Sequence, residues 1–189
     1  MSAEARNRAR QTWLCARQAL GGDISALEFG EVESAVALGG GAEPARLISL
    51  PLGLSALARR YFDAPRPSEA AIEAAIMEVE VRVMPLRSLL APGTRCVTAD
   101  PNVRAMVEVL GLVGEPWVTL ATDAVEQLFN RWLAIALGRP ATQDALPTSG
   151  EFGAALLVLR EWLHHLSHTR IAVTCLIFSD HGLLEGDGS

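Results

Sequence analysis

Residues 95–120 read RCVTADPNVRAMVEVLGLVGEPWVTL, and this stretch decides the fold class. Residues 94–98 are typical of a short strand. Asp100 followed by Pro101 predicts the N-cap and the first-turn proline of a helix of about three turns. Residues 117–120 predict a second strand. A strand, a helix and another strand form a βαβ unit, whose two strands are expected to be parallel neighbours.

Upstream of this unit the sequence predicts a β-hairpin. Residues 31–38 alternate with the two-residue period of a half-buried strand, and residues 46–50 form a second apolar run that Pro51 ends. The glycines at 39–41 lie between them. They could cradle an anion through their backbone N–H groups, but the strand that follows favours a hairpin turn.

Downstream, residues 171–177 are nearly all apolar, which predicts a strand with neighbours on both sides. The helix-forming stretches are residues 3–20, 54–62, 68–90, 100–110, 123–137 and 149–166. Pro85 should break the third of them one turn before its end. The expected fold is therefore α/β, with α+β as the alternative. It comprises a small mixed sheet of about five strands and about six helices in a single domain, residues 1–189, with a disordered tail at 184–189.

Composition restricts the classes of protein that the chain can belong to. The apolar fraction is 50% and the mean hydropathy +0.24, yet no apolar run approaches the roughly 20 residues that span a bilayer. The net charge of -6 disfavours nucleic acid as a partner. Three widely spaced cysteines, Cys15, Cys96 and Cys175, favour reduced thiols. These features predict a cytoplasmic protein that binds neither membrane nor nucleic acid.

Every one of the 16 basic residues is arginine, and alanine is abundant, a bias typical of GC-rich bacterial genomes. A P-loop needs a lysine on the nucleotide phosphates, a pyridoxal phosphate enzyme needs a lysine amine, and a protein kinase needs its strand lysine. The lysine-free sequence excludes all three classes.

A cluster of histidines near the C-terminus is the first candidate site. On a helix, Glu161, His164, His165 and His168 would share one face, opposite a leucine stripe that closes the core. The i, i+4 spacing of His164 and His168 lets two imidazoles reach one metal ion, and Glu161 adds a carboxylate. We weigh this metal site, with a divalent ion as the candidate cofactor, against a plain water-facing helix surface, and favour the latter.

The second candidate is a ligand crevice at the strand ends. Thr98 and Asp100 follow one strand of the βαβ unit, and Thr122 and Asp123 follow the other. If both strand ends face one crevice, these hydroxyls and carboxylates converge there. The competing interpretation makes Asp100 simply a helix N-cap, and the sequence favours it.

Met77, Val81 and Met84 form a second apolar stripe on the long helix, which predicts contact with a second subunit. With few convergent polar residues elsewhere, the leading hypothesis is a non-catalytic, homo-oligomeric accessory or interaction module of bacterial cytoplasm, most simply a homodimer. The alternatives are a metal-dependent enzyme or sensor at Glu161, His164 and His168, and a small-molecule-binding domain at Asp100.

Overall fold

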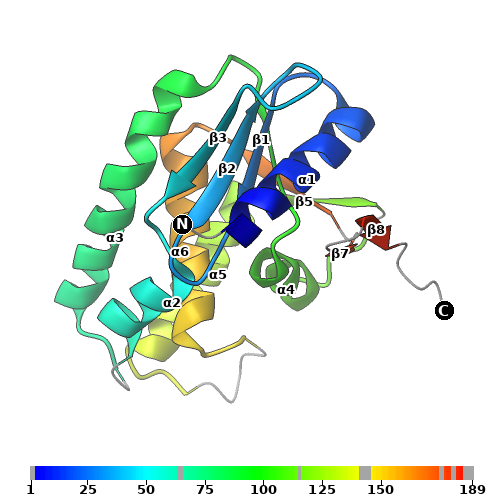
Figure 1. The fold of residues 1–189 in the computed structure, drawn as a ribbon. Coiled ribbons are helices and arrows are strands. Elements are labelled where there is room, and N and C mark those ends of the chain that lie inside the picture. The colour runs from blue at the N-terminus through cyan, green and yellow to red at the C-terminus, as the bar shows by residue number, and fades with distance from the viewer. Residues whose placement is uncertain are drawn as a thin grey trace.

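Figure 1 shows the chain as a computed structural model, in which residues 3–63, 66–114, 116–140, 146–174, 177–179 and 182–184 are described. Within these ranges lie six α-helices: α1 (Ala3–Leu20), α2 (Leu54–Leu57), α3 (Glu69–Val83), α4 (Pro101–Val109), α5 (Thr122–Ala136) and α6 (Gly150–His165). A π-helical turn, η1 (Ala58–Phe62), follows α2, and a 3₁₀ helix, η2 (Met84–Leu89), follows α3. Residues 185–189, most of the predicted tail, lie outside the described residues.

The described strands are β1 (Ile24–Glu28), β2 (Ser34–Gly39), β3 (Arg46–Leu50), β4 (Arg95–Thr98), β5 (Trp117–Ala121), β6 (Arg170–Thr174), β7 (Ile177–Ser179) and β8 (Gly182–Leu184). The first six form one mixed sheet in the order β3-β2-β1-β4-β6-β5, and β7 pairs with β8. β1, β4 and β6 run parallel, whereas β2 and β5 are antiparallel to their neighbours. The α/β class is confirmed, with six strands in place of about five.

Strand β1, which the sequence patterns miss, is covered on both faces. Its sequence is ISALE, and all five residues are buried. Leu27 packs toward α6, whereas Ile24 and Ala26 pack beneath α1. A strand buried on both sides has no two-residue alternation. The strand predicted at 31–38 corresponds to β2, which is also buried from Ser34 to Leu38, so the alternation in its sequence does not mark a half-exposed strand.

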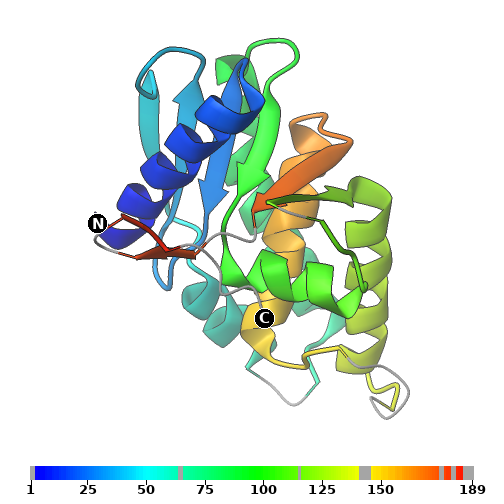
Figure 2. The ribbon, with the colours of Figure 1, turned by 90° about the vertical axis from the view of Figure 1, so that its right-hand side faces the viewer.

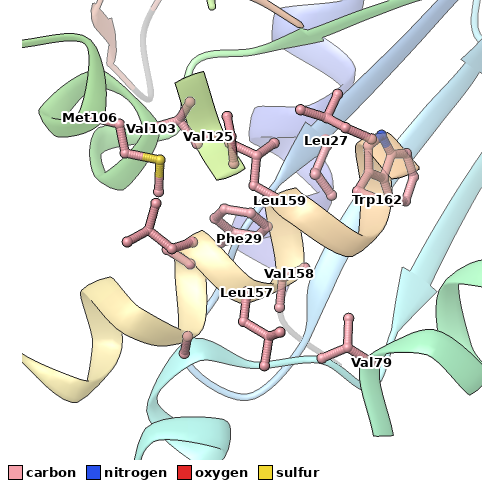
Figure 3. Close-up of a cluster of buried hydrophobic side chains, with 14 of the residues drawn as sticks. Leu27, Phe29, Val79, Val103, Met106, Val125, Leu157, Val158, Leu159 and Trp162 are labelled. Carbon is pink, nitrogen blue, oxygen red and sulfur yellow. The ribbon is translucent and has the colours of Figure 1, made fainter. Parts of the chain in front are cut away.

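Two layers of helices enclose the sheet, as Figure 2 shows. Helix α1 contacts β1, β2, β3 and β4 on one face. On the other face α6 forms the centre of the main core, because α2, α3, α4 and α5 all contact it. Figure 3 shows Leu157, Val158 and Leu159 of α6 among side chains from the sheet and these helices. From residue 152 to residue 159, every residue of α6 is buried.

The predicted parallel pairing of 95–99 with 117–120 is wrong. β4 lies between β1 and β6, and β5 is the edge strand, antiparallel to β6 with Trp117 opposite Thr174. The βαβ rule applies only when the second strand continues the same sheet in parallel. Here the later strand β6 takes the place beside β4, which confirms that residues 170–174 have neighbours on both sides.

Several local predictions are confirmed. β2 and β3 form the expected hairpin, and Ser68 caps α3 by accepting a hydrogen bond from the N–H of Ala71. Helix α3 gives way to η2 at Met84, one residue before Pro85. Met77, Val81 and Met84 are 65%, 69% and 51% exposed. Their contact with a second subunit stays a prediction.

Within the described residues, no helix is both long enough and apolar enough to cross a membrane. Cys15 and Cys96 are free thiols, and Cys175 lies outside the described residues.

Candidate active site

Asp100 is the predicted site residue around which the structure builds a pocket. Its carboxylate is 1% exposed and lies where β4 leads into α4. Oδ1 accepts hydrogen bonds from the backbone N–H of Asn102 at 2.8 Å and from its side-chain amide at 3.1 Å. Asp100 is therefore the N-cap of α4, as expected, and it is also more than a cap, because its second oxygen contacts another strand.

That second contact is half of a reciprocal clamp between the ends of β1 and β4. Oδ2 of Asp100 accepts a hydrogen bond from the N–H of Phe29, just beyond β1, at 3.0 Å. In return, Oε1 of Glu28, the last residue of β1, accepts one from the N–H of Ala99 at 2.6 Å. Thr12 of α1 donates to the same oxygen at 2.8 Å. The two carboxylates thus hold the carboxyl ends of two parallel strands together.

Glu28 is not among the site residues predicted from the sequence. The side chain is wholly buried, and its nearest cation is Arg8 of α1, whose Nε lies 3.8 Å from Oε2. Burial and then the charge of Asp100 raise the pKa of the Glu28 carboxyl to about 7. Burial likewise raises the pKa of Asp100. The one sequence signal was that Glu28 is the acidic residue at the end of the mostly apolar stretch 24–28. Because that stretch was not predicted to be a strand, the position of Glu28 could not be interpreted.

A pocket of about 380 Å³ lies beside the clamp. Its walls come from five places: the start of α1, the turn after β1, the start of α2, the start of α4 and the first turn of α6. Asp100, Asn102 and Arg8 line it, together with the carboxylates of Glu4, Glu31 and Glu151. The parallel strands β1 and β4 end here, which is where open α/β sheets bind their ligands.

The turn after β1 packs tightly against the start of α2, and both segments need a glycine. A Cβ on Gly30 would lie 2.3 Å from the carbonyl oxygen of Glu33, and one on Gly53 would lie 2.2 Å from the backbone of Val32. The N–H of Leu54 donates to the Gly30 carbonyl at 2.9 Å. The start of α2 is therefore bonded directly to the turn that forms the pocket floor.

The predicted convergence of Thr98, Asp100, Thr122 and Asp123 does not occur. Because β5 is antiparallel to β6, Ala121 lies opposite Arg170 at the start of β6, at the other end of the sheet. Thr122 donates to the carbonyl of His168 at 2.8 Å, and Asp123 is exposed. Of the other three residues, Thr98 alone lies beside Asp100. Its hydroxyl oxygen accepts a hydrogen bond from the N–H of Asp100 at 3.0 Å.

The shared water-facing side of Glu161, His164, His165 and His168 is also contradicted. Glu161 is 3% exposed, pairs with Arg160, and lies 3.0 Å from Nε2 of His165. Helix α3 packs on this side of α6 and brings Glu80 within 3.7 Å of His165. His164 is exposed, as expected.

His168 is not on the helix at all. Helix α6 ends at His165, and Ser167 has a left-handed φ of 59°. The i, i+4 spacing that would let His164 and His168 hold one ion requires an unbroken helix. Throughout the described part of the chain, no group of three or more His, Cys, Asp or Glu side chains is placed to hold a metal ion.

No protein-family model matches the sequence, and no curated protein is similar to it at a significant level. Solved structures do resemble it. The Ppx/GppA phosphatase of Aquifex aeolicus superposes with a TM-score of 0.72 at 15% identity, over 89% of this chain and 59% of that one. An exopolyphosphatase from Cytophaga hutchinsonii superposes with a TM-score of 0.68 at 15% identity, over 90% of this chain and 59% of that one. An exopolyphosphatase-like protein superposes with a TM-score of 0.70 at 12% identity, over 92% of this chain and 63% of that one.

At these identities the likeness establishes the fold: the chain has the architecture found in Ppx/GppA phosphatases. The chain spans about three fifths of the length of these structures. The hypothesis of a non-catalytic accessory or interaction module is contradicted by this finding, because the solved structures that share the fold include a Ppx/GppA phosphatase and an exopolyphosphatase. The sequence suggested a passive module because the residues of the clamp are far apart in the chain.

Proposed function

We propose that this chain is a phosphatase domain and that the phosphate group of its substrate binds in the pocket beside Asp100. The supporting observation is the position of that pocket. It opens at the carboxyl ends of two parallel strands, against a buried carboxylate that the Glu28–Asp100 clamp fixes in place. The solved structures with this fold include a Ppx/GppA phosphatase and exopolyphosphatases, which suggests phosphate esters or phosphoanhydrides as the substrate class.

In the hydrolysis, a water oxygen bonds to phosphorus and gives up a proton, while the bond from phosphorus to the leaving oxygen breaks and the leaving oxygen takes up a proton. Oδ2 of Asp100 accepts one hydrogen bond from Phe29, and a carboxylate oxygen can accept a second. We assign Asp100 the task of holding the attacking water. Arg8, which also pairs with Glu4 at 2.9 Å, is the positively charged residue on the pocket wall.

The helices around the pocket also favour an anion. The first turns of α4 and α6 contribute Pro101, Asn102 and Glu151 to its lining, so the positive ends of two helix dipoles point toward it. Glu4, Glu31 and Glu151 oppose this with negative charge. These carboxylates come from different elements and are not placed to hold a metal ion as they stand, so we assign no step to one.

The direct test is release of orthophosphate from p-nitrophenyl phosphate and from tripolyphosphate, each measured with magnesium, with manganese and with a chelator. We expect release in at least one condition. Asp100→Asn should lower the rate by about tenfold or more, because an amide nitrogen then faces the N–H of Phe29 and the water loses its acceptor.

Glu73→Gln is the matched control. Glu73 is an exposed carboxylate on α3, away from the pocket, and the variant should keep the wild-type rate. Circular dichroism would establish that both variants are folded. The proposal is abandoned if neither substrate is hydrolysed under any condition, or if Asp100→Asn is as active as the control.

A further inference from the structure

A second and larger cavity, of about 800 Å³, lies at the opposite end of the sheet. Two loops form most of it: residues 90–94, which lead into β4, and residues 166–169, which lead into β6. Because β4 and β6 are parallel, their amino ends meet here, whereas the Asp100 pocket lies at the carboxyl end of β4. The two sites therefore lie at opposite ends of the parallel strands.

The charge of this cavity is opposite to that of the chain. Its lining includes Arg87, Arg95 and Arg170, and none of the described residues that line it is Asp or Glu. The chain as a whole has a net charge of -6. Three like charges gathered without a counter-charge repel one another, so an anion bound among them is stabilised. We call this cavity the arginine pocket.

The three arginines have no carboxylate partner among the residues that the structure describes. No carboxylate in the described part of the chain forms an ion pair with Arg87, Arg95 or Arg170. Arg95 donates to the backbone carbonyl of Leu20. That bond fixes its position on the wall and leaves its charge uncompensated.

Neutral polar groups complete the wall. Thr119 and Thr169 present hydroxyls. Nε2 of His168 is enclosed and has no hydrogen-bond partner among the described residues. A buried polar atom without a partner costs free energy unless a ligand or water satisfies it. Burial also lowers the pKa of His168, which leaves a neutral imidazole able to donate or accept a hydrogen bond at neutral pH.

We propose that the arginine pocket binds a phosphate-bearing small molecule. Its volume exceeds what one orthophosphate needs and lies in the range of sites for small molecules. Guanidinium groups bind phosphate oxygens through paired N–H donors. The phosphate groups would lie against Arg87, Arg95 and Arg170. Leu90, Pro92 and Leu166 provide an apolar wall for any organic part. The site does not depend on the proposed phosphatase activity.

The test is isothermal titration of the whole chain with ADP and, separately, with tripolyphosphate. The double variant Arg87→Gln, Arg170→Gln should bind about tenfold more weakly or worse, because each replacement removes a positive charge and its paired N–H donors. Both side chains are exposed, so the fold should be unaffected. The matched control is Arg59→Gln, an exposed arginine outside the cavity. Each titration is repeated in the Asp100→Asn background, where the same weakening by the double variant separates this site from the Asp100 pocket.

The two ligands distinguish the source of the phosphate. Tighter binding of ADP indicates a nucleotide-like ligand that uses the apolar wall, and tighter binding of tripolyphosphate indicates an inorganic phosphate chain. Amide chemical shifts of the wild type provide a second measurement, and Gly93, Thr94 and residues 167–170 should move. The proposal is overturned if neither ligand binds, if the double variant binds like Arg59→Gln, or if the shifts lie elsewhere.

Discussion

Replacing Gly153 with alanine is expected to destabilise the fold by roughly 3 kcal/mol or more. Gly153 lies inside α6. Because glycine has no side chain, the ring of Trp132 from α5 packs directly against the helix backbone at this position. A Cβ built at Gly153 would lie 2.0 Å from Cζ2 of Trp132 and 2.3 Å from Cη2. Alanine would gain about 1 kcal/mol of helix propensity, which is less than the cost of the overlap.

The overlap cannot be relieved cheaply because Trp132 has no room to move. Its ring is 3% exposed and packs edge to face against Phe62, with ring centroids 5.1 Å apart. Thermal unfolding should show a midpoint lower by about 6–12 °C for a chain of this size. Gly41→Ala is the control, since its Cβ meets nothing closer than 3.4 Å. Equal midpoints for the two variants would show that the α5–α6 contact is looser than described.

Replacing Glu28 with glutamine is expected to remove a large pH dependence of stability. Folding raises the pKa of Glu28 from 4.5 to about 7, so the folded state holds this proton more tightly than the unfolded state. The resulting stabilisation is fully present below pH 4.5 and is lost as the pH rises through 7. Between these limits the wild type should lose on the order of 2–3 kcal/mol more than Glu28→Gln.

Urea unfolding at a series of pH values measures the difference. Asp100, Arg8 and Thr12 face Glu28, and Asp100, whose pKa burial also raises, titrates in both proteins. The difference between wild type and variant therefore reports Glu28 together with its effect on the titration of Asp100. Glu73→Gln, at an exposed position, should follow the wild type. Parallel curves for wild type and Glu28→Gln would mean that the buried carboxyl titrates normally and that the clamp is not formed as described.

The sequence predicted those parts of the fold whose signals are local. Ser68 and Asp100 are N-caps, and the strands around residues 39–41 form a hairpin, because these features depend on neighbours within a few residues. The order of strands in the sheet depends on distant pairings. Trp117 begins a strand, as predicted, but nothing near it in the sequence indicates that its partner is residue 174.

The candidate site was predicted in part for the same reason. Asp100 was selected because it follows a strand, and that placement is correct. Glu28, its partner in the clamp, precedes it by more than seventy positions and lies in a strand without alternation. The helical spacing on which the metal hypothesis for Glu161, His164 and His168 depended is not present. α3 covers one side of α6, and the helix ends before His168.

The measurement that tests the phosphate site most directly is an NMR titration with orthophosphate. It is best performed on the Arg87→Gln, Arg170→Gln variant, in which the arginine pocket is weakened. The N–H of Phe29 and that of Asn102 both donate to Asp100, so their amide signals report on this wall. We predict that these two signals and that of Gly30 shift with saturation as phosphate is added. Saturable shifts confined to other parts of the chain, or no shifts at all, would contradict the assignment.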